Sequence, residues 1–260
     1  MYSELLVFSD TLKDQVVNGP QARVILAKAC EHFPIDTRVF ARDAQGKPLQ
    51  AIFAPEADGR ALPKPPLIHF GGGKGYVRLV GTGAEGVALL KSQAALIGTA
   101  LGEHFGAPIS FKLNDGHCRI EPLHGFVRTY FIPHLGITKK EGEMKKIAAR
   151  DERVTLDAVT PWIKKLIVDG LISQARFLDD SYREIGNPDR AVLESAVGTD
   201  DMLDIQVFEG NPHFKQVHQG MKGKVLCVSG IAFTMAADLE GPWTCGVLRS
   251  RGWGSIRKAI

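Results

Sequence analysis

The chain has 260 residues, of which 44% are hydrophobic and 23% charged, values typical of globular proteins with a sizeable core. Its four cysteines are far apart and form no C-x-x-C pair, which argues against a zinc site and a disulfide scaffold. The N-terminus lacks signal-peptide features, and the longest apolar stretch, 87–102, is interrupted by Lys91 and Gln93. We therefore expect a cytoplasmic protein with no membrane segment, no metal and no cofactor.

The first half of the chain alternates short apolar runs with two helical patterns. Strands are predicted at 4–8, 37–42, 50–53, 67–70, 76–80, 109–113 and 117–121. The first helix is predicted from Gly19-Pro20 to about His32, and the second over 85–104. The turn sequence Asn114-Asp115-Gly116 predicts a hairpin between the last two strands. This order of elements is that of a ferredoxin-like α/β module.

The second half changes from apolar strands to charged helices and back. Strands are predicted at 126–132, 205–208, 224–234 and 245–248, and helices at 139–153, 156–171 and 174–183. The sequence thus predicts an α/β (α+β) protein with two ferredoxin-like (RRM-like) modules and a C-terminal glycine-rich loop. The N-terminal module would span 1–122, and the C-terminal module 123–260 would contain a helical insertion at about 138–198.

The net charge of +3 is unevenly distributed along the chain. Residues 166–209 hold ten acidic side chains and three arginines, so this stretch carries −7 and the remainder carries +10. A basic body with one acidic segment suits a polyanionic partner. Two ordinary solvated faces would produce the same distribution, so charge alone does not decide between them.

Two glycine-rich segments resemble phosphate-binding loops. The segment Gly81–Gly86 matches G-x-G-x-x-G between a predicted strand and a helix, as a dinucleotide site requires. However, the next acidic strand end, Asp115, lies well beyond the ~20 residues expected for a ribose-binding carboxylate. We interpret this segment as a tight strand-to-helix turn and keep a nucleotide-binding oxidoreductase as a distant alternative. The segment Gly71–Gly75 is no P-loop, because no Ser or Thr follows Lys74.

The C-terminus carries the strongest indication of a binding function. Its last twelve residues include four basic side chains and no acidic one. Glycines allow the backbone to approach a phosphate closely, arginines supply forked donors, and a tryptophan can stack on a base. The predicted RNA contacts here are Arg249, Arg251, Gly252, Trp253 and Gly254. An ordinary basic tail with a structural tryptophan is the alternative.

An apolar strand, VLCVSGIAF, followed by a loop and a G-x-x-R-x-R-G-x-G element resembles the RAMP proteins of CRISPR systems. With its length, N-terminal module and basic helical segment, the chain looks most like the repeat-processing endoribonuclease of type IV systems. The resemblance implies binding of a CRISPR repeat stem-loop, one metal-independent cut by a 2′-hydroxyl, and retention of the crRNA. It also implies other CRISPR effector subunits as partners. A non-catalytic crRNA-binding subunit of such a complex is the main alternative.

In relatives of this kind, a histidine or another polar residue in or near the first helix often aligns the attack. Arg23 and His32 are nine residues apart, so they project from opposite sides of the helix. Arg23 lies in the first turn, where free N–H groups favour an anion. Arg38 begins the following strand, from which we expect it to converge on the same face of the sheet. We predict Arg23 and Arg38 as catalytic groups with an electrostatic role, because arginine stays protonated, and we keep His32 in reserve.

The basic helix predicted at 139–153 would grip the RNA. Its candidate contacts are Lys139, Lys140, Lys145, Lys146 and Arg150. Four acidic residues are interspersed among them, which favours an ordinary solvated helix about as strongly.

Overall fold

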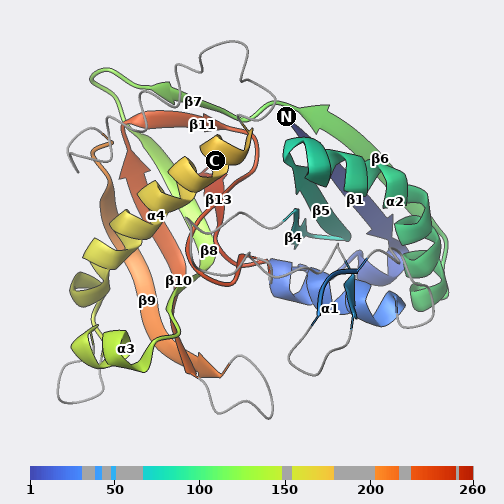
Figure 1. Cartoon of the computed structure of the whole chain (residues 1–260), viewed down its shortest axis with the longest axis horizontal. Coiled ribbons are helices and arrows are strands. Elements are labelled where there is room, and N and C mark those ends of the chain that lie inside the picture. The colour runs from blue at the N-terminus through green and yellow to red at the C-terminus, as the bar shows by residue number, and fades with distance from the viewer. Residues whose placement is uncertain are drawn as a thin grey trace. The chain divides into compact units, whose positions relative to one another are not determined.

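The computed structural model describes residues 1–30, 39–42, 48–50, 67–147, 154–178, 203–216, 224–249 and 252–259 (Figure 1). It contains both helices and sheets, which confirms the predicted mixed fold class. The chain divides into two compact units. Unit 1 holds residues 1–118 together with Arg249 and Gly252, and unit 2 holds most of the remainder. The predicted module boundary after residue 122 and the extent of the insertion stay predictions.

Unit 1 contains the first elements of the chain and one four-stranded sheet. Its elements are β1 (Tyr2–Ser9), the short 3-10 helix η1 (Asp10–Leu12), α1 (Gly19–Ala29), β2 (Val39–Arg42), β3 (Pro48–Gln50), β4 (Ile68–Gly73), β5 (Tyr76–Thr82), α2 (Gly83–Phe105) and β6 (Ile109–Gly116). The sheet has the order β4-β5-β1-β6, and β2 pairs separately with β3. Helix α1 follows the first strand of the sheet and α2 connects the third to the fourth, which is the ferredoxin-like arrangement.

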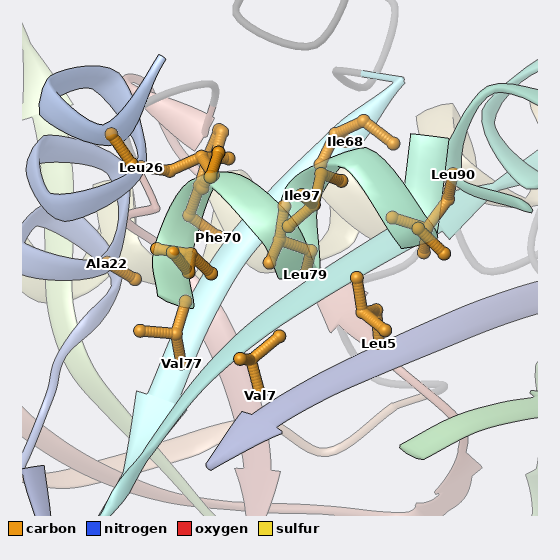
Figure 2. Close-up of a cluster of buried hydrophobic side chains, with 14 of the residues drawn as sticks. Leu5, Val7, Ala22, Leu26, Ile68, Phe70, Val77, Leu79, Leu90 and Ile97 are labelled. Carbon is orange, nitrogen blue, oxygen red and sulfur yellow. The ribbon is translucent and has the colours of Figure 1, made fainter. Parts of the chain in front are cut away.

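The two helices of unit 1 pack on one face of this sheet. Helix α2 packs on β1 and β5, and α1 packs on β4. Alternate residues of the central strands supply the core, because successive side chains of a strand point to opposite faces. Figure 2 shows this buried cluster, which includes Leu5, Val7, Phe70, Val77, Leu79, Leu90 and Ile97.

Every described pairing in this sheet is antiparallel. A dinucleotide-binding fold needs a mostly parallel sheet, so the architecture does not fit the oxidoreductase alternative. The segment Gly81–Gly86 forms a close strand-to-helix approach instead: a Cβ atom on Gly81 would overlap the backbone of Gly86. The interpretation as a tight turn is therefore confirmed.

The predicted hairpin at Asn114-Asp115-Gly116 is wrong. These residues continue β6 and pair with Glu4, Ser3 and Tyr2 of β1. The Asp115 carboxylate accepts hydrogen bonds from the Ser3 hydroxyl and from the Lys91 ammonium, the latter at 2.7 Å. Because β1 offers partners along its whole length, the tertiary pairing outweighs the local turn preference of the sequence.

Unit 2 repeats the strand order of unit 1. Its elements are β7 (Arg119–Pro122), β8 (Arg128–Thr138), α3 (Glu141–Ile147), α4 (Leu156–Leu178), β9 (Gln206–Gln216), β10 (Lys224–Met235), β11 (Ala237–Glu240), β12 (Trp243–Thr244) and β13 (Ser255–Lys258). The main sheet has the order β12-β13-β8-β10-β9, and β7 pairs with β11. Strands β9-β10-β8-β13 thus match β4-β5-β1-β6, with α4 as the first crossover helix.

Two sequence predictions in unit 2 are wrong. Helix α4 continues across 171–174, where a break was expected, because a stripe of buried residues runs from Val159 to Ala175 on one of its faces. The terminal strand is β13 rather than 245–248. Gly246 and Leu248 have positive φ angles of 76° and 69°, which interrupt an extended strand at that point.

Of the helices in the described ranges, none combines the length and the apolar character that crossing a bilayer requires.

Candidate nucleic-acid interface

The start of α1 is a well-defined helix N-terminus in unit 1. Asn18 caps it by accepting a hydrogen bond from the Gln21 backbone N–H at 3.0 Å, and the Gln21 side chain accepts one from the Asn18 N–H at 2.9 Å. This reciprocal pair fixes the first turn, which also contains Pro20. The predicted catalytic residue Arg23 lies in the next turn and is partly exposed. The other two candidates, Arg38 and His32, lie outside the described residues.

The glycine-rich C-terminal segment reaches this helix N-terminus within unit 1. A Cβ atom on Gly19 would overlap the backbone of Gly252, and a Cβ atom on Gly252 would overlap the backbone of Gly19. Gly252 has a φ of 78°, and its N–H donates to the Arg249 carbonyl at 2.9 Å. Only glycine allows two backbones to approach so closely. The structure thus brings together two predicted RNA-contacting elements that are more than 200 residues apart.

The flanks of this segment are anchored in unit 2 by buried hydrogen bonds. The Gln174 amide of α4 donates to the Pro242 carbonyl and accepts from the Thr244 N–H and hydroxyl, both at 3.1 Å. The Cys245 N–H donates to the Gly254 carbonyl at 2.9 Å, and the Gly254 N–H donates to the His134 carbonyl at 2.7 Å. These bonds fix the two flanks of the segment, at Pro242–Cys245 and at Gly254.

Trp253 lies in a small core cluster of unit 2 with Val225, Cys227 and Leu248. Only 6% of its surface is exposed. The Lys215 ammonium lies 5.3 Å from the centroid of the indole ring. Little of the ring therefore remains for stacking on a base, and the predicted role of Trp253 in RNA binding stays a prediction that this burial does not favour.

A polar cluster beside Trp253 was missed by the sequence analysis. His134 of β8 faces Ser229 of β10, with 3.3 Å between Nδ1 and the hydroxyl oxygen. Burial, and then electrostatic repulsion from Lys215 and His213, lower the pKa of His134 below its ordinary value. The imidazole therefore favours its neutral form at neutral pH. The only sequence signal was the alternation His213-x-Lys215, because the members come from three different strands.

The predicted basic helix is short, and its charges are partly compensated. In and beside α3, the Lys140 ammonium lies 3.1 Å from the Glu143 carboxylate, and Lys145 lies 2.8 Å from Glu141. Hydrogen bonding to Glu141 raises the pKa of Lys145. Lys139 and Lys146 are exposed. These ion pairs are typical of a solvated helix.

Of the four remaining predicted RNA contacts, two lie among the described residues and two do not. Arg249 is buried, with 1% of its surface exposed, and Gly254 lies at the loop end described above. Arg150 and Arg251 lie outside the described residues. Within the ranges that the structure describes, no three His, Cys, Asp or Glu side chains gather as metal ligands would.

Comparison with known proteins decides the family. The sequence profile of the type IV CRISPR-associated endonuclease Csf5 matches residues 1–260. The chain belongs to this family. Among the curated proteins, no match was found.

Two solved structures have a similar fold. One is "Csf5, CRISPR-Cas type IV Cas6 crRNA endonuclease", with 19% sequence identity, a TM-score of 0.62 and 100% of both chains covered. The other, a crystal structure of Cas6b, has 14% identity, a TM-score of 0.52 and the same coverage. At these identities the likeness concerns the fold, and it agrees with the ferredoxin-like strand order of both units.

Proposed function

We propose that this Csf5 family member binds the hairpin of a CRISPR repeat RNA in the cytoplasm and cuts it once at its base. The observation that carries the proposal is the family match over the whole chain, residues 1–260. The mature crRNA stays bound to the protein, which presents it to other CRISPR effector subunits.

The reaction needs no metal ion. The 2′-hydroxyl oxygen upstream of the cut attacks the adjacent phosphorus, and the bond from phosphorus to the 5′-oxygen breaks. The products are a 2′,3′-cyclic phosphate and a 5′-hydroxyl; the 2′-hydroxyl loses its proton to solvent and the leaving oxygen gains one. What the protein supplies is alignment of these atoms and positive charge near the phosphorane.

The N-terminus of α1 is the proposed position of the scissile phosphate. The close approach of Gly252 to Gly19 supports it, because the glycine-rich segment then lies next to the positive end of the helix that carries Arg23. Arg23 stabilises the phosphorane together with Arg38, and His32 is held in reserve. Gly252 and Gly254 shape the loop that faces the RNA backbone. The further RNA contacts that we propose are Arg249, Arg251, Trp253, Lys139, Lys140, Lys145, Lys146 and Arg150.

The experiment that tests this function is incubation of the purified protein with EDTA and labelled CRISPR repeat hairpins, followed by mapping of the product ends. We expect one cut, a 2′,3′-cyclic phosphate end, and product that remains bound on a gel. Tight binding without a cut would identify the chain as a non-catalytic crRNA-binding subunit. Absence of binding would refute RNA as the substrate.

A further inference from the structure

The sheet of unit 1 has a second face, opposite the helices. Leu5 and Val7 of β1 point into the core, as do Val77 and Leu79 of β5 (Figure 2). The alternation of a strand therefore places the residues between them on the other face. We call this the outer face; it carries Leu6, Phe8, Tyr76, Arg78, Ser110 and Lys112.

Two aromatic rings lie side by side on the outer face, on the two central strands. Phe8 and Tyr76 are directly opposite one another in the ladder, and their ring centroids are 5.5 Å apart with the planes tilted by 48°. Phe8 is 37% exposed, although an apolar ring of this size is usually buried. The exposed ring of Phe8 beside the half-buried ring of Tyr76, on the central strands of a ferredoxin-like sheet, provides an aromatic face on which an unpaired base can stack.

A glycine on the neighbouring strand leaves room for one of these rings. A Cβ atom on Gly73 of β4 would lie 2.5 Å from the ring atoms of Tyr76. The tyrosine ring therefore lies over the space that a side chain at position 73 would occupy. The glycines that resemble a P-loop in the sequence thus make room for an aromatic surface.

A basic groove borders this aromatic pair. It has a volume of about 560 Å³ and is lined by Phe8, Asp10, Lys13, Lys74, Pro108 and Ser110, among others. Its size falls in the range of small-molecule binding sites. Among the described residues, neither Lys13 nor Lys74 has an ion-pair partner, and both are exposed. Asp10 offsets one of the two charges, so the charged side chains that line the groove leave it with a net charge of +1.

Backbone hydrogen bonds join the two chain segments that carry these lysines. The Val17 N–H donates to the Gly73 carbonyl, and the Gly75 N–H donates to the Gln15 carbonyl, both at 3.0 Å. These bonds fix the segment after η1 against the turn between β4 and β5. Lys13 and Lys74 thus reach the groove from two chain segments whose positions do not depend on a ligand.

We propose that the outer face and its groove bind a single-stranded RNA segment. One base stacks on Phe8 beside Tyr76, and Lys13 and Lys74 contact the adjoining phosphates. The inference rests on the proposed function in one respect: the strand bound here is an unpaired part of the same RNA whose hairpin is cleaved. Stacking and phosphate contacts of this kind need no particular base sequence.

The test is equilibrium binding of a labelled oligouridine of about eight nucleotides to the full chain, followed by fluorescence anisotropy. Phe8→Ala should weaken binding about tenfold, and Phe8→Tyr, which keeps a ring, should restore it. The double variant Lys13→Gln with Lys74→Gln should lower the slope of log affinity against log salt by about 1.4. Thermal melting of each variant verifies that it is folded.

Matched controls come from the same chain. Phe126 is 76% exposed and lies in unit 2, so Phe126→Ala should leave affinity unchanged. The double variant Lys28→Gln with Lys224→Gln removes two exposed charges outside the groove. It should change the slope of log affinity against log salt by less than the Lys13 and Lys74 double variant does. Oligouridine binding that is insensitive to Phe8→Ala, or reduced equally by Phe126→Ala, would overturn the proposal. An exposed ring without an RNA contact would then indicate a protein partner.

The outcome is separable from that of the proposed function. Hairpin cleavage with unchanged oligouridine binding in Phe8→Ala would refute this site and leave the nuclease intact. Phe8-dependent oligouridine binding by a protein that cuts no repeat would support the site and refute the nuclease.

Discussion

The two sheets share one strand order but differ in the connection between their third and fourth strands. In unit 1 this connection is the 23-residue helix α2, whose backbone groups satisfy one another. In unit 2 the same position holds β11, β12 and the glycine-rich loop. A loop can therefore stand on this fold where the other unit has a crossover helix. The backbone N–H and C=O groups of such a loop then need hydrogen-bond partners from other parts of the protein.

In unit 2, side chains provide hydrogen bonds to backbone groups of this connection that a helix would have satisfied internally. The buried Tyr130 hydroxyl donates to the Ala237 carbonyl at 2.9 Å and accepts from the Leu239 N–H at 2.8 Å. Burial raises the pKa of Tyr130 to about 12, so the hydroxyl keeps its proton at any physiological pH. Gln174 plays the same role at the Pro242–Thr244 segment. The glycine-rich loop is thus anchored on buried polar contacts of unit 2.

The largest effect is expected where the loop returns to the sheet. Gly254→Ala places a side chain at a φ of 77° and against the backbone of Cys245. We expect a loss of about 2–5 kcal/mol in the free energy of unfolding, measured by chemical denaturation.

Gly230→Ala is the matched control, because Gly230 has a φ of 64° and no atom lies within 4 Å of the place that its Cβ would take. It should lose only the conformational cost of about 1–2 kcal/mol. Equal losses in the two variants would contradict the close packing of the loop end.

A smaller effect is expected from removing the amide that anchors the other end of the loop. Gln174→Met keeps the approximate shape of the side chain but removes the acceptor of the buried Thr244 N–H and the amide that donates to the Pro242 carbonyl. The free energy of unfolding should fall by about 2–4 kcal/mol. Gln206→Met changes an exposed residue of β9 and should stay within about 0.5 kcal/mol of wild type. An unchanged free energy of unfolding in Gln174→Met would show that the stability of this segment does not depend on its contacts with α4.

The smallest effect concerns pH and the His134 cluster. Because the pKa of His134 is lowered in the folded state, the unfolded chain takes up a proton as pH falls below about 6.5 while the folded chain does not. The free energy of unfolding should therefore fall as the pH is lowered from about 7.5 to about 5.5. His134→Gln should reduce this pH dependence. Denaturation midpoints at both pH values measure it, with the exposed His124→Gln as control. A wild-type pH dependence in His134→Gln would contradict the assigned cause.

Local pattern predicted much of this fold and failed where long-range strand pairing or backbone conformation decides the structure. Apolar alternation located the central strands and the two helices of unit 1, because each of these elements carries a periodic apolar face of its own. The Asn114–Gly116 turn and the strand at 245–248 were wrong, because pairing with β1 and the left-handed residues Gly246 and Leu248 decide those segments.

The candidate site was predictable in composition but not in arrangement. The basic glycine-rich end and the helix start at Gly19 each stood out, whereas their contact through Gly252 depends on the tertiary fold. The cluster of His134, His213 and Ser229 was missed, because the register of three strands brings its members together and the His213-x-Lys215 alternation shows only one of them. Similarly, the exposure of Phe8 beside Tyr76 follows from the pairing of β1 with β5.

The measurement that tests the central claim most directly is the single-turnover cleavage rate of Arg23→Ala on a CRISPR repeat hairpin, with the affinity measured in parallel. Loss of the charge beside the phosphorane should slow cleavage by at least about 100-fold while affinity changes little. Lys28→Ala, at the other end of α1, should cleave as wild type does, and the wild-type rate should vary little between about pH 6 and about pH 8. Wild-type cleavage by Arg23→Ala would contradict the placement of the reaction at the start of α1.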